Sequence, residues 1–281
     1  MSEQHLVLQG ISVTESDIAT IAALVCAEEV RRVKPNVYRL ANAIPHTDVE
    51  KQCAALGLDY GFVSPDLTLS DLELVALDMD STLINIESLD EVADFAGVKD
   101  EVTAITQKSM QGEVDFTASL RQRVALLKGL DIRALEQVYN ERLKLNPGAE
   151  QLIATLQSQG IKTMLVSGGF TYFTERLKQR LKLDHAFANE LEIVAGRLTG
   201  NLVGEILDGN AKARHVREIC RLYGIDTPAT VLAIGDGAND QAMLSAAGIG
   251  IAYRAKTVLR QQASYRIDHV GLDGVLNLFA S

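Results

Sequence analysis

The stretch LELVALDMDST at residues 72–82 decides the fold. Its first part, Leu72–Leu77, is an almost uninterrupted apolar run, which is typical of a strand buried on both faces of a parallel sheet. Asp78 and Asp80 follow at once, and the two-residue period of a strand places both carboxylates on one face. Two such carboxylates repel each other unless a cation or a shared proton relieves the repulsion. The sequence therefore predicts a charged site at the carboxyl end of a buried strand.

Further along the chain, apolar runs alternate with amphipathic stretches. The runs predicted as strands are Ile161–Val166, Val231–Ile234, Gly248–Ala252 and an edge strand at Tyr265–Ile267. The stretches with helical spacing are Ala149–Gln159, Tyr172–Leu183, Ala211–Tyr223 and Asp240–Ala247. This alternation predicts an α/β fold with a doubly wound, Rossmann-like and mostly parallel sheet. Two β runs around Ala195–Arg197 interrupt the pattern and predict a hairpin on the rim, within residues 190–205.

The interval between the first two strands of this sheet is too long for a simple crossover. A βαβ connection needs only about a dozen residues, whereas this interval also contains residues 87–146, with helical patterns such as FTASLRQRVALLKGL at 116–130. We predict a helical cap, at about residues 87–146, inserted after the first strand. Such a cap closes over the carboxyl ends of the strands, where these sheets bind their ligands.

Residues 1–70 predict a small α+β unit that precedes a larger domain at residues 71–281. Its predicted strands are His5–Gln9, Glu29–Val33, Val37–Leu40 and Tyr60–Val63, and its predicted helices are Asp17–Ala27, capped by Ser16, and Thr47–Leu56. The order β-α-β-β-α-β resembles the ferredoxin-like arrangement of ACT-type regulatory domains. The linker is predicted at Ser64–Ser70. We expect residues 1–70 to form an accessory or regulatory domain. A homodimer is compatible with this expectation.

Three further motifs follow predicted strands or open a predicted helix. They are Ser167-Gly168-Gly169, the lysine of Asn210-Ala211-Lys212, and Gly235-Asp236-Gly237-Ala238-Asn239-Asp240. Each alone has an ordinary explanation as a glycine turn, a solvated lysine or a capped turn. Together with Asp78 and Asp80 they supply a nucleophile, an acid or base, phosphate donors, a cation and oxygen ligands for a metal, which phosphoryl transfer requires. The sequence GxxxxGK[ST] is absent, which excludes a P-loop NTPase.

These motifs resemble those of the haloacid dehalogenase-like (HAD) hydrolase superfamily. The resemblance is closest to its phosphoserine phosphatase family, through DMDSTLINIESLDEVA, LRQRVALLKGL, VSGGFTYF, AFANELEI, GNAKA and AIGDGANDQAML. It extends from about Leu72 to Ile267 and does not cover the N-terminal unit well. It implies Mg²⁺-dependent hydrolysis of O-phospho-L-serine through an aspartyl-phosphate, which is the last step of L-serine biosynthesis.

The resemblance also implies a role for each motif residue. Asp78 attacks phosphorus, and Asp80 is the general acid and base. Mg²⁺ is held by Asp78, the backbone carbonyl of Asp80 and Asp236, with Asp240 in support. The phosphoryl oxygens are bound by Ser167, Gly168 and Lys212.

Recognition of the serine moiety is expected mainly in the cap. The resemblance implies that Glu87 pairs with the substrate ammonium and Arg123 with its carboxylate. Met110 and Phe116 close an apolar lid, and Asn239 contacts the phosphate or the rest of the substrate.

Composition excludes several other classes of protein. The chain has 281 residues and a formal net charge of −10, so it lacks the basic character of a nucleic-acid binder. No apolar run approaches the roughly 20 residues of a membrane span, and the N-terminus has no secretory pattern. Cys26, Cys53 and Cys220 form no metal or disulfide pattern, so we expect a reducing cytoplasm.

Two alternatives stay open on the sequence alone. The first is a phosphotransferase, or a phosphatase for another small phosphoester such as phosphohomoserine, since the same core also transfers phosphoryl groups to alcohols. The second is an amino-acid sensor with residues 1–70 as the ligand site and a relict core. A phosphorylation receiver also uses an acidic cluster, but it lacks the helical insert.

Overall fold

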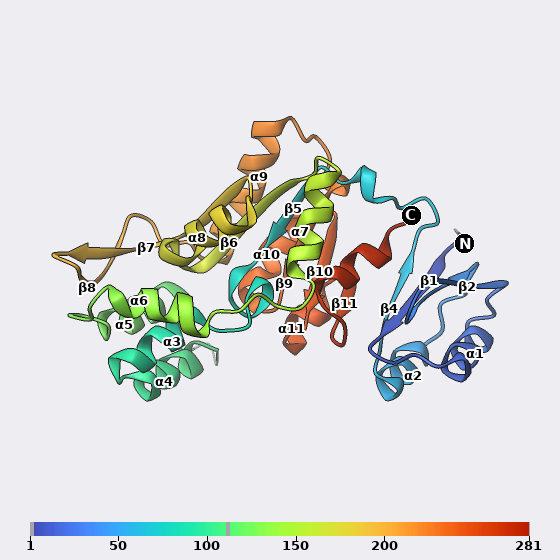
Figure 1. Cartoon of the computed structure of the whole chain (residues 1–281), viewed down its shortest axis with the longest axis horizontal. Helices are drawn as coiled ribbons and strands as arrows, with labels where there is room; N and C mark the ends of the chain where they lie inside the picture. The colour runs from blue at the N-terminus through green and yellow to red at the C-terminus, as the bar shows by residue number, and fades with distance from the viewer. Residues whose placement is uncertain (1–2, 111–112, 281) are drawn as a thin grey trace.

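The computed structural model describes residues 3–110 and 113–280, without the side chain of Met110. Its two sheets lie beside each other, and a set of helices lies at the far end of the larger sheet from the smaller one (Figure 1). Within the described residues, no helix combines the length and the apolar character that a bilayer crossing requires.

The larger sheet has seven strands in the order β11-β10-β9-β5-β6-β7-β8. They are β5 (Leu74–Leu77), β6 (Lys162–Phe170), β7 (His185–Val194), β8 (Arg197–Val203), β9 (Val231–Gly235), β10 (Ile249–Tyr253) and β11 (Tyr265–Ile267). Every neighbouring pair is parallel except β7 and β8, which form the rim hairpin. The predicted doubly wound sheet is confirmed, with β5 at its centre between β6 and β9.

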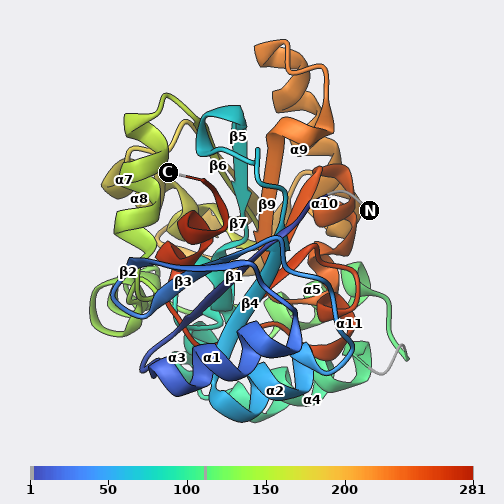
Figure 2. The same cartoon turned by 90° about the vertical axis from the view of Figure 1, so that its right-hand side faces the viewer.

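Helices cover both faces of this sheet (Figure 2). One face carries α7 (Ala149–Ser158) and α8 (Thr171–Leu181), and the other carries α9 (Gly209–Tyr223) and α10 (Gln241–Ala246); the short α11 (Thr257–Arg260) follows β10. β5 contributes Val75 and Leu77 to the first core and Leu74 and Ala76 to the second, and none of the four has any exposed surface. Burial on both faces explains why this strand is apolar throughout.

The insert between β5 and β6 is helical, as predicted. It contains α3 (Ser88–Ala96), α4 (Lys99–Met110), α5 (Phe116–Ala125) and α6 (Arg133–Gln137). Figure 1 shows these helices together, below the β7–β8 hairpin and away from β1–β4. Leu120 and Val124 of α5 are buried in the same apolar core as the α7 and α8 face, so the cap is packed onto the sheet domain.

The smaller sheet has the strand order β2-β3-β1-β4, with every neighbouring pair antiparallel. Its elements are β1 (His5–Gly10), α1 (Glu15–Leu24), β2 (Glu29–Lys34), β3 (Val37–Ala41), α2 (Val49–Leu56) and β4 (Leu58–Val63). This is the ferredoxin-like arrangement that the sequence predicted. The helices share an apolar core with one face of the sheet. From the other face, Val7 and Val63 join the core of the large domain.

One local prediction was wrong. Helix α1 is capped by Thr14 and not by Ser16, because Thr14 and Asp17 form a capping box in which each side chain accepts a hydrogen bond from the backbone of the other, and the helix ends at Leu24. The rim hairpin is confirmed, with its turn at Ala195 and Gly196, but β7 begins at His185, earlier than predicted, and its first half pairs in parallel with β6. That half alternates weakly between polar and apolar residues, so periodicity alone did not reveal it.

Candidate active site

The acidic residues meet because β5 and β9 are neighbours in the sheet. Asp78 follows β5 directly, and its N–H donates to the Ile234 carbonyl at 2.9 Å. Asp236 follows β9, and one carboxylate oxygen each of Asp78, Asp236 and Asp240 lies within 4.8 Å of the others. All three residues are buried. Oxygen donors of this kind suit a hard divalent cation, and the concentration of negative charge favours one.

Lys212 brings a buried ammonium to the same place. Its Nζ donates to Asp78 Oδ1 at 2.5 Å and to Asp240 Oδ1 at 2.6 Å, and the lysine side chain is 1% exposed. Burial alone lowers the pKa of this lysine, but the charges of Asp240 and Asp78 outweigh that effect and raise it. Lys212 therefore stays cationic beside Asp78.

Asp240 fixes the loop that follows β9. Its Oδ2 accepts from the N–H groups of Asp236 and Gly237, at 3.2 and 3.1 Å. A Cβ on Gly235 would lie 2.5 Å from the Asp240 carboxyl carbon, so glycine is required there. Because Lys212 occupies its other oxygen, Asp240 has both oxygens engaged within the protein. Burial, followed by the charge of Asp240, raises the pKa of Asp236 to about 7.

Asp80 lies in the tight turn at residues 79–83 that leads into α3. The backbone N–H of Ser88 donates to Asp80 Oδ1 at 3.1 Å, and the Ser88 hydroxyl donates to Asp80 Oδ2 at 3.0 Å. Burial, followed by the charge of Glu87, raises the pKa of Asp80 to about 8. Asp80 thus retains a proton near neutral pH, as a general acid must.

Ser167, Gly168 and Gly169 form an outward bulge within β6. Four steps along β6, from Val166 to Phe170, match only two along β7. A Cβ on Gly169 would lie 2.8 Å from Asp80 Oδ2 and 3.1 Å from Ser167 Oγ, so the bulge lies directly against Asp80. The close approach explains the glycine at this position.

Of the predicted cap residues, Phe116 lies against the same bulge. Phe116 Cζ lies 3.3 Å from the position of a Cβ on Gly168. Arg123 is half-buried, and burial lowers its pKa, while the charges of Asp90 and Glu87 act in the opposite direction. Among the described residues Arg123 has no carboxylate within ion-pair distance and donates only to the Ser119 carbonyl and the Thr106 hydroxyl. Glu87 accepts from the Ser81 hydroxyl at 2.7 Å.

Two predicted residues are not brought into this cluster by direct contacts. The side chain of Met110 lies outside the described residues. Asn239 lies against the start of α9, where a Cβ on Gly209 would meet its carbonyl oxygen at 2.8 Å, and no hydrogen bond joins its side chain to another predicted residue in the described chain.

Three further residues contact or lie beside the predicted site residues and were not predicted from the sequence: Ser88, Asp90 and Asn189. Ser88 binds both oxygens of Asp80, Asp90 is a charged neighbour of Arg123, and Asn189 donates to the Gly168 carbonyl. A polar residue at the first helical position after Glu87 was an available signal for Ser88. Asn189 gave no comparable signal, because its role depends on the register between two strands.

Comparison with known proteins agrees with this geometry. The family profile described as haloacid dehalogenase-like hydrolase matches residues 75–245, and one described as a domain of unknown function matches residues 6–49. A phosphoserine phosphatase from Polaromonas sp. is 49% identical over 227 residues, which cover 79% of this chain and 96% of that protein.

Two solved structures are also similar. A probable phosphoserine phosphatase from Vibrio cholerae superposes with a TM-score of 0.84 at 37% identity, covering 98% of this chain and 85% of that one. A phosphoserine phosphatase described as a phospho-aspartyl intermediate analogue has a TM-score of 0.70 at 41% identity, covering 74% of this chain and 99% of its own. With the acid cluster, the buried lysine and the glycine bulge in place, this chain belongs to the phosphoserine phosphatase family of haloacid dehalogenase-like hydrolases.

Proposed function

We propose that the protein hydrolyses O-phospho-L-serine to L-serine and inorganic phosphate, with Mg²⁺, through a phosphoryl group carried on Asp78. The observation that carries the proposal is the buried contact between Asp78 and Lys212 at the carboxyl end of the central strand. The names of the relatives support the substrate, and one relative was solved as an analogue of a phospho-aspartyl intermediate. The reaction would be the last step of L-serine biosynthesis.

Asp78 is the proposed nucleophile. Its carboxylate oxygen attacks phosphorus, the bond from phosphorus to the serine oxygen breaks, and the proton of Asp80 passes to that oxygen. Water then attacks phosphorus, Asp80 takes up its proton, and the bond from Asp78 to phosphorus breaks to release phosphate. Asp80 is suited to both steps, because its raised pKa of about 8 keeps the proton available near neutral pH and makes the carboxylate that remains after its transfer a stronger base toward water.

Residues of the chain fit a Mg²⁺ site. The proposed ligands are Asp78, the backbone carbonyl of Asp80, and Asp236. Asp240 is assigned a supporting role, since Lys212 and two backbone N–H groups already occupy its oxygens. When bound, Mg²⁺ offsets the repulsion between a phosphate dianion and the Asp78 carboxylate.

The remaining polar groups divide between the two ends of the substrate. We assign Ser167, the Gly168 N–H and Lys212 to the phosphoryl oxygens. Arg123 is assigned to the α-carboxylate, because its guanidinium is half-buried and has no carboxylate within ion-pair distance among the described residues. Glu87 is assigned to the ammonium, with Phe116, Met110 and Asn239 completing the enclosure.

We further propose that residues 71–281 form the phosphatase, with a cap at about 87–146, and that residues 1–70 form an accessory or regulatory domain. The contacts between the two sheets support a fixed arrangement: Asp59 of β4 accepts backbone N–H bonds from Asp268, His269 and Val270, at 2.7 to 3.2 Å.

The test is phosphate release from L-phosphoserine, phosphothreonine, phosphohomoserine and an aryl phosphate, each with Mg²⁺ and with EDTA. We expect a strong preference for L-phosphoserine that requires Mg²⁺. Equal rates across the panel would overturn the assignment of the cap residues, and absence of turnover on every substrate would overturn the proposed function.

A further inference from the structure

Asn189 lies where β6 and β7 resume their pairing after the bulge at Ser167–Gly169. Val166 pairs with Phe187 and Phe170 pairs with Asn189, so the carbonyls of the bulge lose the partners that a regular ladder would provide. Buried backbone groups need replacement partners. The side chain of Asn189, which is 3% exposed, supplies one of them.

The amide of Asn189 makes one hydrogen bond from each end. Its Nδ2 donates to the Gly168 carbonyl at 2.9 Å, and its Oδ1 accepts from the Leu207 N–H at 2.7 Å. The side chain therefore bridges the bulge to the segment that precedes α9. An amide offers a donor and an acceptor on one short planar group, so neither an ionised Asp nor Leu can replace both bonds.

The bond to Gly168 sets the direction of a peptide dipole beside the phosphate position. In a trans peptide the Gly168 carbonyl and the Gly169 N–H point in opposite directions. With that carbonyl held by Asn189, the Gly169 N–H points toward Ser167 and donates to its Oγ at 2.9 Å. A reversed peptide would turn a carbonyl oxygen toward an anion and withdraw a donor from Ser167.

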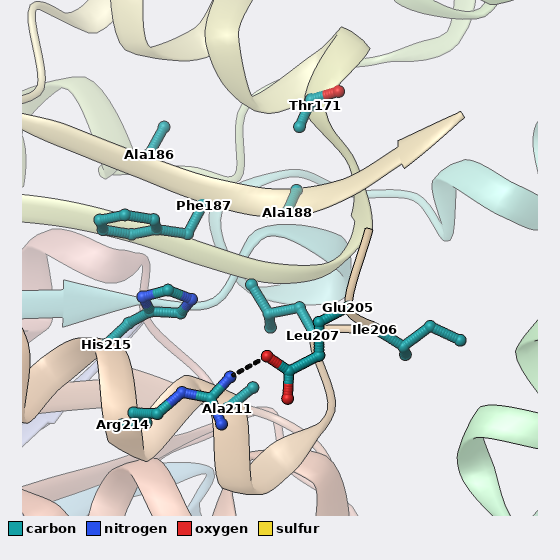
Figure 3. A pocket seen from close by; sticks show the side chains of 10 residues that line it. All are labelled: Thr171, Ala186, Phe187, Ala188, Glu205, Ile206, Leu207, Ala211, Arg214 and His215. Atoms are coloured by element: carbon teal, nitrogen blue, oxygen red, sulfur yellow. Dashed lines mark hydrogen bonds and ion pairs between the residues drawn. The ribbon is translucent and has the colours of Figure 1, made fainter. Parts of the chain in front are cut away.

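The bond to Leu207 acts on the segment that leads to Lys212. Asp208 caps α9 by accepting from the Ala211 N–H at 2.8 Å, and Lys212 follows in the first turn. The outer side of this segment is hollow, since a pocket of about 360 Å³ opens between β7 and α9, as Figure 3 shows around Ala188, Leu207 and Ala211. Leu207 lines this pocket and is itself buried, and the hydrogen bond from Asn189 fixes the position of its backbone.

We propose that Asn189 is a positioning residue for phosphoryl transfer. It fixes the position of the phosphate-binding bulge relative to the start of α9, the helix that carries Lys212. The inference rests on the proposed function. Asn189 itself touches neither the phosphoryl group nor the serine moiety. Loss of the Asn189 side chain should therefore weaken binding of the phosphoryl group of every substrate, whatever its leaving group.

The discriminating variant is Asn189→Asp, which keeps the acceptor for Leu207 and places an oxygen against the Gly168 carbonyl. We expect kcat/KM to fall roughly 100-fold for both L-phosphoserine and an aryl phosphate, comparable to the loss of one transition-state donor. The inhibition constant of inorganic phosphate rises in parallel. Asn201→Asp, at an exposed position on β8, adds the same charge and leaves all three values unchanged.

Thermal unfolding with and without inorganic phosphate and Mg²⁺ gives a readout that needs no turnover. Phosphate should raise the Tm of the wild type and of Asn201→Asp but not that of Asn189→Asp. If Asn189→Asp does not fold, Asn189→Ala decides by the same measurements, with a loss of about 10-fold expected.

Two results would overturn the role of Asn189. One is a loss confined to L-phosphoserine, which would place its effect in the cap. The other is a folded Asn189→Ala variant with wild-type kcat/KM and wild-type response to phosphate. A wild-type enzyme that binds phosphate but hydrolyses no phosphoester would instead refute the proposed function. The change in Tm on addition of phosphate would still test the role of Asn189.

Discussion

Lys212 and Asp78 are 134 positions apart in the sequence, yet Nζ and Oδ1 lie 2.5 Å apart, and both side chains are buried. The same ammonium reaches Asp240 at 2.6 Å, so one cation faces a cluster of three carboxylates that also includes Asp236. With all groups ionised, the cluster has a charge of −3 + 1 = −2. One divalent cation would neutralise this charge. Removal of the cation should therefore change the stability of the folded protein.

Metal-free protein should lose stability as the pH rises. Burial raises the pKa of Asp236 to about 7 in the folded state, against an ordinary value of 3.8, so folding favours its protonated form. This stabilisation is complete below about pH 4 and is lost progressively as the pH rises through 7. In EDTA the Tm should therefore fall between pH 5 and pH 8, and Mg²⁺ should restore it most strongly at pH 8.

Asp236→Asn provides the matched comparison for that titration. In EDTA at pH 8 we expect this variant to unfold at a higher temperature than the wild type, and its Tm should no longer respond to Mg²⁺. If Mg²⁺ did not change the Tm of the wild type at any pH, the metal site would be refuted.

The proton on Asp80 should limit the rate only when the leaving group needs it. Burial, followed by the charge of Glu87, raises its pKa to about 8, so turnover of L-phosphoserine should decline as the pH rises above 8 and Asp80 loses its proton. The aryloxide of an aryl phosphate can leave without protonation. The pre-steady-state burst of aryloxide release should therefore persist at pH 9. Equal alkaline losses in the burst rates of both substrates would contradict the assignment of Asp80 as the acid.

Arg123→Ala should separate recognition of the serine carboxylate from the chemical step. Loss of a charged hydrogen bond of about 1.5–3 kcal/mol predicts a rise in KM of roughly 10- to 100-fold for L-phosphoserine. Turnover of an aryl phosphate should be unchanged. Arg121→Ala, an exposed arginine on the same helix, is the control and should behave as the wild type. Similar effects of the two variants would show that only the general charge of α5 matters.

Arg39 of β3 should stabilise the contact between the smaller sheet and the C-terminal segment without affecting catalysis. Its Nη2 donates to the carbonyls of Asn277, Leu278 and Phe279, at 3.3, 3.4 and 2.8 Å. Arg39→Met leaves these carbonyls without that donor, and a cost of about 1–3 kcal/mol lowers the Tm by several degrees. The kcat/KM for L-phosphoserine should stay within about two-fold of the wild type.

Arg31→Met is the control for Arg39. Arg31 is exposed on β2 and lies opposite Arg39 in the sheet register. Its removal should leave the Tm within about 1 °C of the wild type, since surface substitutions rarely exceed about 0.5 kcal/mol. If Arg39→Met left the Tm equally unaffected, the three hydrogen bonds would have no measurable role in holding the smaller sheet to the C-terminal segment.

The core of the site was predictable because its signals are local. The apolar run before Asp78 marks a buried strand, and Asp236 follows a second such strand. The parallel arrangement of strands then brings their ends together whatever the intervening sequence contains. The glycines at 168, 169 and 235 were readable for the same reason, since turns and close approaches restrict the residue type.

What the sequence did not reveal depends on register and on hydrogen bonds between distant segments. Asn189 looks like an ordinary polar residue in a weak strand until the bulge in β6 brings the Gly168 carbonyl to it. The Thr14 cap was confused with Ser16 because both hydroxyl residues precede the helix, and only the reciprocal bond with Asp17 separates them. Neither of these hydrogen-bonding arrangements follows from the composition of the chain or from the periodicity of its apolar residues.

The most direct test is to locate the phosphoryl group on the enzyme. Wild-type protein mixed with L-phosphoserine and Mg²⁺ is quenched in acid within one turnover, and its peptides are examined by mass spectrometry after borohydride reduction, which converts an aspartyl-phosphate to homoserine. We expect homoserine at position 78, and none in Asp78→Asn. Modification at Ser167 or another residue, or rapid turnover by Asp78→Asn, would contradict the assignment of Asp78 as the nucleophile.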